Sequence, residues 1–466
     1  SLRKGVIALS LRHVDISGLP KDFMWGAGTS SMQIEGGHAS GDRGRCIWDD
    51  LGEVPGAIKD GTGANHRGVE HVEMLETDLN IMKDLSLDSY RFSISWPRVQ
   101  PTGSGAFNEK GMAFYDRLID GLLERDIAPN LTLYHWDLPS ELQAIGGWTN
   151  PRVVDLFGEY AAKMSSRYGD RVKYWATMNE PWCVAWLGNL TGEHAPGIRD
   201  LPTAVRVAHQ LVRAHALGSQ AIKSQSPKVL VGAVNNLTNP MLIGEATKEN
   251  LKDLQIVDGY KNRWWMQGMY EGKYPADLVE IFEKETGIFC DENEIGDVSF
   301  GRDWIGLNYY NADVFSGGGT GDELFPRTTS IQGAGYGTER TDMGWSWTPD
   351  GIKTTLIEIS QKYPDIPVFV SENGSCYNDG PSEDGKIHDT KRDEYLSLYI
   401  KSCVEAYKSG VNLKGYYLWS LLDNFEWAWG FEMRFGLVHV DFKNRMTRTP
   451  KESALGYRDL IRSSKN

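Results

Sequence analysis

The sequence predicts an α/β protein built as a single (β/α)8 TIM barrel. Eight short apolar runs, rich in β-branched and aromatic residues, recur along the 466 residues, and segments with helical periodicity separate them. The runs are almost continuously apolar rather than alternating, as expected for strands that are buried on both faces. The chain shows no internal repeat and no linker rich in Pro, Gly or Ser, so we expect one large domain rather than several.

The strands are predicted within residues 23–31, 89–96, 128–136, 173–181, 229–239, 303–311, 367–374 and 413–424. Helices are predicted over residues 69–85, 109–125, 150–170, 202–224, 250–269, 350–363 and 391–409. The helix at 150–170 has the clearest signals, because Asn150 can cap it, Pro151 suits its first turn and Gly169 can end it.

Two segments are predicted to lie outside this alternation. Residues 1–18 are expected to be a poorly ordered extension, with the remnant of a leader as the alternative, and residues 19–466 are expected to form the (β/α)8 domain. The stretch 315–340 contains "SGGGTGD". It lacks the Gly-Lys-Ser/Thr ending of a phosphate-binding loop, so we interpret it as a long loop at the rim of the site.

Composition excludes several classes of partner. The net charge of −14 argues against nucleic acid or an anionic membrane as a partner, and no apolar segment is long enough to span a bilayer. Five cysteines without CxxC spacing indicate free thiols in a reducing, cytoplasmic compartment. Ten histidines without HExxH-type spacing predict no metal, and we expect no cofactor. A homo-oligomer remains open.

Polar and aromatic residues gather where the predicted strands end. In a barrel of this kind the active site lies at the carboxyl ends of the strands, so these side chains should converge on one mouth. They are Gln33, Arg91, His135, Asn179, Glu180, Asn308, Tyr310, Glu372, Trp419 and Glu426.

Two glutamates in this set, Glu180 and Glu372, each follow a predicted buried strand. Glu180 lies at the end of the apolar part of "YWATMNEPW", and Glu372 lies at the end of the apolar part of "PVFVSENG". A buried carboxylate is costly unless it is paired, hydrogen-bonded or used. Either one alone would be interpreted as the structural partner of an arginine. Two carboxyl groups across one cleft can cleave a glycosidic bond, one donating a proton while the other attacks the anomeric carbon or activates water.

The motifs "TMNEP" and "SENG" resemble the acid/base and nucleophile motifs of glycoside hydrolase family 1, the β-glucosidases. The segments "FMWGAGTSSMQIEGG", "SYRFSISWPR", "TLYHWDLP", "GLNYYN", "TDMGW" and "YYLWSLLDNFEWAWGF" are similar to family segments and follow the family order. The resemblance covers almost the whole chain. It implies a retaining β-glycosidase that removes terminal non-reducing β-D-glucosyl residues from β-glucosides and short oligosaccharides through a covalent intermediate.

The resemblance also implies a role for each matching residue. Glu180 corresponds to the acid/base and Glu372 to the nucleophile. The residues matching the sugar-binding positions are Gln33, His135, Asn179, Tyr310, Trp419, Glu426 and Trp427, with Trp345 on the aglycone side. Arg91, Asn308 and Tyr310 match residues that surround the nucleophile. Pro181 is expected to fix the exit of the chain from its strand.

Two alternative functions agree less well with the sequence. A 6-phospho-β-glycosidase would lack the carboxylate of "FEW", which is present here as Glu426. We expect Glu426 to be ionised and to accept hydrogen bonds from the sugar, with an ion pair to Arg434 as the structural alternative. A catalytically dead, sugar-binding or receptor-like module would have lost one catalytic Glu, and both are present.

Overall fold

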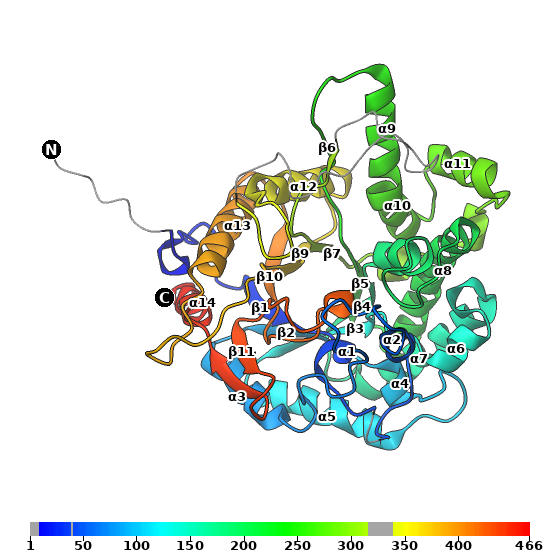
Figure 1. Cartoon of the computed structure of the whole chain (residues 1–466). Helices are drawn as coiled ribbons and strands as arrows, with labels where there is room; N and C mark the ends of the chain where they lie inside the picture. Colours follow the sequence, from blue (N-terminus) through cyan, green and yellow to red (C-terminus); the bar gives the residue numbers. More distant parts are fainter. Residues whose placement is uncertain (1–8, 39–40, 316–338) are drawn as a thin grey trace.

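The computed structural model describes residues 9–38, 41–315 and 339–466, which form a closed parallel barrel surrounded by helices (Figure 1). The order of the eight strands is β1-β10-β9-β7-β5-β4-β3-β2. Their bounds are β1 Met24–Gly28, β2 Ser89–Ser93, β3 Ala128–Tyr134, β4 Tyr174–Asn179, β5 Leu230–Asn235, β7 Trp304–Asn308, β9 Val368–Asn373 and β10 Leu413–Trp419. Each falls within a predicted run, so the (β/α)8 fold class is confirmed.

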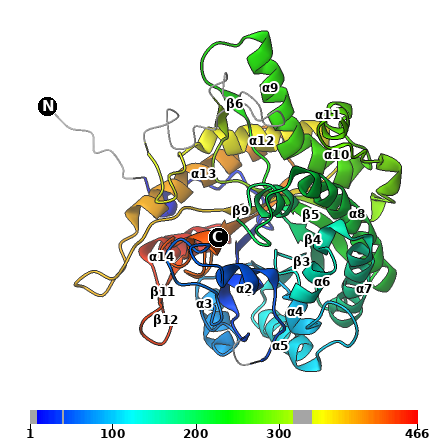
Figure 2. The ribbon, with the colours of Figure 1, turned by 45° about the vertical axis from the view of Figure 1, so that its right-hand side comes forward.

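The helices around the barrel also follow the predicted order (Figures 1 and 2). They are α3 Leu75–Asp84, α5 Glu109–Leu123, α7 Pro151–Tyr168, α8 Leu201–Gln225, α9 Lys248–Asp258, α10 Trp264–Glu271, α11 Ala276–Thr286, α12 Pro349–Lys362, α13 Thr390–Lys408 and α14 Glu452–Ser463. At the start of α7 the Asn150 side chain accepts a hydrogen bond from the Arg152 N–H at 2.9 Å, as its sequence suggests.

The helices differ from expectation in three respects. Helix α3 begins at Leu75 rather than near residue 69, because the chain turns before it and Glu70 has a positive φ of 58°. The single helix predicted over 250–269 is α9 and α10, joined by the π-helical turn η4 (Gly259–Arg263). Helices α11 and α14 were not predicted.

Short elements form the rim of the barrel. They are the helices α1 Ser31–Ile34, α2 Ile47–Gly52, α4 Trp96–Val99 and α6 Ser140–Ala144, the parallel pair β6 Met241–Leu242 and β8 Val314–Phe315, and the antiparallel hairpin β11 Val438–Asp441 with β12 Thr447–Pro450. Helix α9 and β6 project beyond the ring of helices in both views (Figures 1 and 2). Elements this short contain too few residues to show a periodicity.

Side chains from five neighbouring strands pack together inside the barrel. Ala176, Val234, Trp304, Phe369 and Tyr417 form a buried cluster that is separate from the main core between strands and helices. The fit is tight: a Cβ on Gly26 would lie 2.6 Å from the Tyr417 ring. This packing provides a rigid base beneath the carboxyl ends of the strands.

The predicted disorder of residues 1–18 is wrong for the part that the structure describes. Leu11 is fully buried, and its N–H donates to Asp393 Oδ1 of α13 at 2.7 Å. The short helix η1 (Leu11–His13) packs on α14, where Arg12 pairs with Asp459. Burial of these apolar residues offsets the cost of ordering the segment. Residues 1–8, and most of the predicted rim loop at 315–340, lie outside the described residues.

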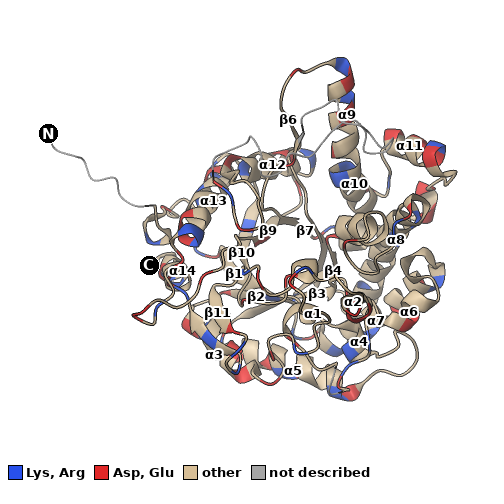
Figure 3. Ribbon diagram, in the orientation of Figure 1, with Lys and Arg blue, Asp and Glu red and all other residues tan. Residues whose placement is uncertain are grey.

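Acidic and basic residues are interspersed over the outer helices that the structure describes (Figure 3). The net charge of −14 is therefore spread over the molecule. None of the helices in the described ranges is both long and apolar enough to cross a membrane.

Candidate active site

A cavity of about 500 Å³ lies at the carboxyl ends of the barrel strands. Of the residues predicted from the sequence, those that line it are His135, Glu180, Asn308, Tyr310, Trp345, Glu372, Trp419, Glu426 and Trp427. The other three, Gln33, Arg91 and Asn179, are buried behind the lining residues and position them.

Glu372 lies within β9, one residue before its end, and both of its carboxylate oxygens have donors. Arg91 Nη1 donates to Oε1 at 2.8 Å, and the Tyr310 hydroxyl donates to Oε2 at 2.6 Å. Burial and the neighbouring Glu372 raise the pKa of Tyr310 well above its usual range, so its hydroxyl remains a donor. The side chain of Glu372 is only 5% exposed, and the guanidinium compensates its charge. The result is an oriented carboxylate in a nearly dry site.

Glu180 directly follows β4 and has a φ of 47°, in the left-handed region. Such a conformation costs on the order of 1–3 kcal/mol for a non-glycine residue and is typical of functional sites. The Glu180 N–H donates to the Val234 carbonyl at 2.8 Å, which holds this turn. Pro181 then starts a helical segment, which is possible because the first turn of a helix needs no N–H donor. The centre of this segment is the π-helical turn η3 (Cys183–Leu187).

The carboxyl group of Glu180 is in a different environment from that of Glu372. Asn308 Nδ2 donates to Oε1 at 3.2 Å, and the Cys183 thiol donates to Oε2 at 3.6 Å. Burial, and then repulsion by Glu372, raise the pKa of Glu180 to about 8. Glu180 therefore holds a proton at neutral pH, whereas Glu372 is paired with the Arg91 guanidinium. The two environments suit a proton donor and a nucleophile respectively.

An amide network links the two glutamates to His135. Asn179 Oδ1 accepts hydrogen bonds from Arg91 Nη2 at 2.7 Å and Asn308 Nδ2 at 3.0 Å. Its Nδ2 must then donate to His135 Nε2, 3.0 Å away. Burial lowers the pKa of His135 well below its usual value, so the ring is neutral and carries its proton on Nδ1. That buried Nδ1 has no partner among the described residues, so it can donate to a ligand hydroxyl.

Aromatic rings form the wall beside His135. The His135 imidazole is stacked with two indole rings: its centroid lies 5.8 Å from that of Trp419 and 5.9 Å from that of Trp427. The Tyr310 and Trp345 rings, which also line the cavity, have centroids 5.3 Å apart. Flat apolar rings beside a few polar atoms suit the C–H face and the hydroxyl groups of a sugar ring.

Glu426 was expected to be ionised, but its pKa is raised in the folded protein. Burial, together with Glu372 and Glu180, raises its pKa to about 8, and a hydrogen bond from Gln33 opposes this shift. Burial is the larger cause and the two neighbouring glutamates add to it, so the acid form of Glu426 is favoured over the form expected from the sequence. The alternative ion pair is not formed, since Arg434 Nη1 instead donates to Asp423 at 2.6 Å. Glu426 Oε2 has no hydrogen-bond partner in the described part of the chain.

Sequence reasoning did not assign a binding role to several residues that line the cavity. They are Trp136, Trp182, Cys183, Asn236, Thr238, Lys261, Asn311 and Asp313. Trp182 and Cys183 follow Glu180 closely, and that adjacency is the signal that could have identified them. Lys261, in the π-helical turn η4, and Asp313, just before β8, are distant from Glu180 in the sequence and belong to no motif.

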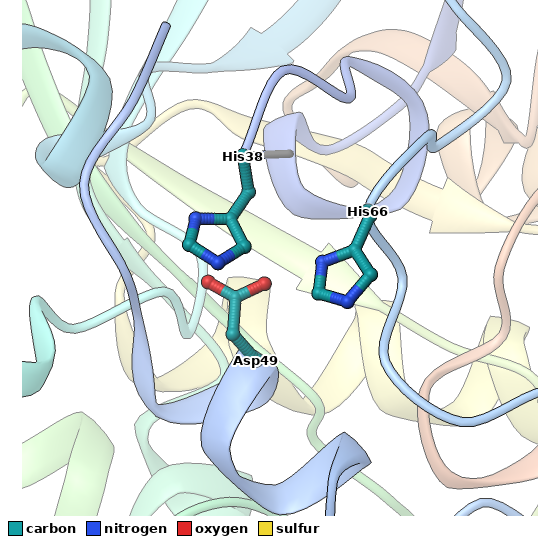
Figure 4. A group of neighbouring side chains, drawn as sticks. All are labelled: His38, Asp49 and His66. Atoms are coloured by element: carbon teal, nitrogen blue, oxygen red, sulfur yellow. The ribbon is translucent and has the colours of Figure 1, made fainter. Parts of the chain in front are cut away.

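A separate group of possible metal ligands lies outside this cavity (Figure 4). Ligand atoms of His38, Asp49 and His66 lie within 4.8 Å of one another, the one such group in the described ranges. Arg43, however, donates to both carboxylate oxygens of Asp49, at 2.7 and 2.9 Å, and the Cys46 N–H donates to one of them. A cation would have to lie against this guanidinium, so we assign the group to a buried ion pair.

Comparison with known proteins agrees with the fold and the site. Residues 16–466 match the model of glycosyl hydrolase family 1. The chain is 38% identical to beta-glucosidase A of Acetivibrio thermocellus, covering 96% of this chain and 98% of that one. It is also 38% identical to beta-glucosidase A of Thermotoga maritima, covering 97% and 99%. The structure of a beta-glucosidase from Thermotoga maritima in complex with glucoimidazole superposes with a TM-score of 0.89 at 36% identity, covering 96% and 99%.

The family match spans nearly the whole barrel, and the two glutamates lie in one cavity at the carboxyl ends of its strands. The protein is therefore a glycosidase that belongs to glycosyl hydrolase family 1.

Proposed function

We propose that this protein is a β-glucosidase that removes the terminal non-reducing β-D-glucosyl residue from β-glucosides and short oligosaccharides, with retention of configuration. The observation that carries this proposal is the pair formed by a protonated Glu180 and an arginine-bound Glu372 in one cavity. The names of the related β-glucosidases support the choice of glucose.

The chemistry follows from the proton on Glu180 and the ion pair between Arg91 and Glu372. The Glu372 carboxylate attacks the anomeric carbon while the bond to the leaving oxygen breaks, and the proton of Glu180 moves to that oxygen. Glu372 is now an uncharged ester, so the repulsion that raised the pKa of Glu180 is lost. Glu180, as a carboxylate, then takes a proton from water, whose oxygen attacks the anomeric carbon. Glucose leaves, Glu372 is again a carboxylate, and Glu180 again holds a proton.

The test is the configuration of the first product. Proton NMR during hydrolysis of 4-nitrophenyl β-glucoside should show β-glucose before mutarotation. Initial α-glucose, or no hydrolysis at all, would reject the proposal.

We also propose a cytoplasmic location, supported by five free and buried thiols. A homo-oligomer stays a prediction that solution scattering can check.

The alternative 6-phospho-β-glycosidase is disfavoured by Glu426. A neutral sugar can exchange hydrogen bonds with this group, whereas a 6-phosphate carries a charge of about −1.5 to −2 and would be repelled by the Glu372 carboxylate and by the ionised form of Glu426, which line the same cavity. We expect Glu426→Ser to lower kcat/KM for 4-nitrophenyl β-glucoside at least tenfold, about 1.4 kcal/mol of transition-state binding. The ratio of activity on the 6-phosphate to activity on the neutral substrate should rise.

Glu432→Ser is the matched control for Glu426, because Glu432 is exposed and outside this cavity. It should leave both substrates unaffected. If Glu426→Ser leaves the ratio between the two substrates unchanged, Glu426 is not the selecting group.

The Cys183 thiol gives a prediction on pH dependence. Its hydrogen bond to Glu180 stabilises the carboxylate form and so lowers the pKa of Glu180, against the larger effect of burial. Activity needs protonated Glu180 and falls as pH rises through that pKa. Cys183→Ala should therefore move the alkaline limb of kcat/KM upward by about half a pH unit, as the loss of a weak hydrogen bond implies. Cys403→Ala, a buried thiol of α13, should not move it. A downward shift would contradict the prediction.

A further inference from the structure

A buried ion pair lies close to Glu426 in the chain but outside the cavity. Asp423, three residues before Glu426, is fully buried, and its Oδ1 accepts a hydrogen bond from the equally buried Lys451 Nζ at 2.9 Å. Lys451 directly precedes α14. Neither residue of the pair is among the described residues that line the cavity, and neither takes part in the mechanism.

We propose that Asp423 and Lys451 are positioning residues that hold Glu426 in place for the sugar. This inference rests on the proposed β-glucosidase function. It adds to the same site a buried ion pair through which the start of α14 contributes to substrate binding.

Asp423 closes the loop that carries Glu426. The chain leaves β10, runs through residues 420–437 and returns as β11. The Asp423 N–H donates to the Val438 carbonyl at 3.0 Å, and Asp423 Oδ1 accepts a hydrogen bond from the Gly436 N–H at 2.9 Å. A Cβ on residue 436 would lie 2.6 Å from that oxygen, so glycine allows the close approach. One carboxylate thus joins both ends of the loop.

Lys451 fastens this closure to the helical layer. Its N–H donates to the Leu437 carbonyl at 2.9 Å, while its Nζ binds Asp423. The second oxygen of Asp423 accepts from Arg434 Nη1 at 2.6 Å and from the Val440 N–H at 3.4 Å. Burial by itself would raise the pKa of Asp423, but Lys451 and Arg434 outweigh it and lower the pKa below its usual value. Asp423 is therefore a carboxylate with donors on both oxygens.

The two residues between Asp423 and Glu426 are held by Gln33. Its Nε2 donates to Asn424 Oδ1 at 3.0 Å and to the Phe425 carbonyl at 2.8 Å. Phe425 is fully buried, and Asn424 is only 3% exposed. A segment packed this closely transmits a displacement, because its side chains have no free space in which to absorb it. When Asp423 moves, the carboxyl group of Glu426 moves as well.

Stability alone does not account for an ion pair buried this deeply. The cost of taking two charges out of water offsets most of their attraction, and well-packed apolar residues often replace such pairs without loss. Hydrogen bonds between charged groups do add a defined geometry. Glu426 needs such a geometry, because a displacement of about 1 Å in a binding group can lower a rate about 10²-fold.

The first test is Lys451→Met, which removes the ammonium and leaves Asp423 paired with Arg434. KM for 4-nitrophenyl β-glucoside should rise at least threefold and kcat/KM should fall at least fivefold, because a displaced Glu426 binds the sugar less tightly. Loss of folded enzyme would instead lower kcat and leave KM unchanged. The double variant Asp423→Asn with Lys451→Met removes both charges together and should show the same rise in KM.

Arg448→Met is the matched control. Arg448 of β12 and Asp78 of α3 form another buried ion pair, 2.8 Å apart, with side chains 1% and 0% exposed. Asp78 keeps a second partner in this variant, since His71 Nδ1 lies 2.7 Å from its carboxylate. Arg448 lies outside the 420–437 loop. The control should lower the melting temperature about as much as Lys451→Met, while KM stays unchanged.

A double-mutant cycle separates positioning from stability. In Glu426→Ser the group to be positioned is gone, so adding Lys451→Met should change kcat/KM less than twofold. An equal loss in both backgrounds would overturn the inference. So would unchanged kinetics of Lys451→Met, or a rise in KM for Arg448→Met as large as its own. If neither Lys451→Met nor the double variant folds, the pair serves stability and the inference fails. Failure of the proposed function looks different, because the unmodified chain would then not hydrolyse the glucoside.

Discussion

Glu372→Gly should abolish turnover of every β-glucoside, by at least about 10⁴-fold in kcat, even with a good leaving group such as 2,4-dinitrophenolate. The carboxylate is the group that forms the bond to the anomeric carbon, and among the residues that the structure describes no other side chain of the cavity receives hydrogen bonds from both Arg91 and Tyr310. The rate of dinitrophenolate release, followed by absorbance, measures the loss. The melting temperature shows whether the variant remains folded without a partner for Arg91.

A rescue experiment tests the role of Glu372 independently of the size of the loss. Glycine leaves room for azide between the Arg91 and Tyr310 donors, on the face opposite the leaving group. Azide should restore activity and yield α-glucosyl azide by a single inversion. Glu432→Gly serves as the control and should keep its activity without azide. Substantial activity of Glu372→Gly without azide, or a β-azide product, would show that another group is the nucleophile.

Glu180→Gln should slow substrates according to their leaving groups. The amide cannot donate the proton of an acid, so poor leaving groups such as cellobiose and methyl β-glucoside should lose about 10²–10⁴-fold, the usual contribution of general acid catalysis. A dinitrophenolate needs little protonation, and its release should show a rapid burst before slow hydrolysis. The burst follows because the variant also lacks the base that activates water. Stopped-flow absorbance resolves the two phases.

The product with azide distinguishes Glu180 from Glu372. In Glu180→Gln the glucosyl enzyme still forms, and azide should attack from the acid/base side to give β-glucosyl azide. Equal losses across all leaving groups, with no burst, would mean that the two roles have been assigned to the wrong residues.

The barrel and the two glutamates were accessible from the sequence because both leave local signals. Strands buried on both faces must be apolar throughout, so each barrel strand appeared as a recognisable run. A carboxylate that ends such a run is conspicuous because burial is costly, and Glu180 and Glu372 stood out for this reason. The helix boundaries at Asn150 and Pro151 were equally local, since capping depends on neighbouring residues only.

Other features depend on residues that are distant in the chain. Leu11 is ordered because α13 and α14 cover it, and nothing near residue 11 reveals those helices. The pKa of Glu426 is raised because folding buries its carboxyl group and brings it close to Glu372 and Glu180, so this shift is a property of the assembled cavity. Lys261 and Asp313 lie 52 positions apart and become one polar contact only when η4 meets the segment after β7.

The sequence by itself thus determined the architecture, the reacting pair of carboxyl groups and the class of chemistry. The tertiary structure alone decided which groups share the cavity and how their pKa values shift. The physical reason is range: burial patterns and caps act over a few residues along the chain, whereas desolvation and the interaction of charges act through space.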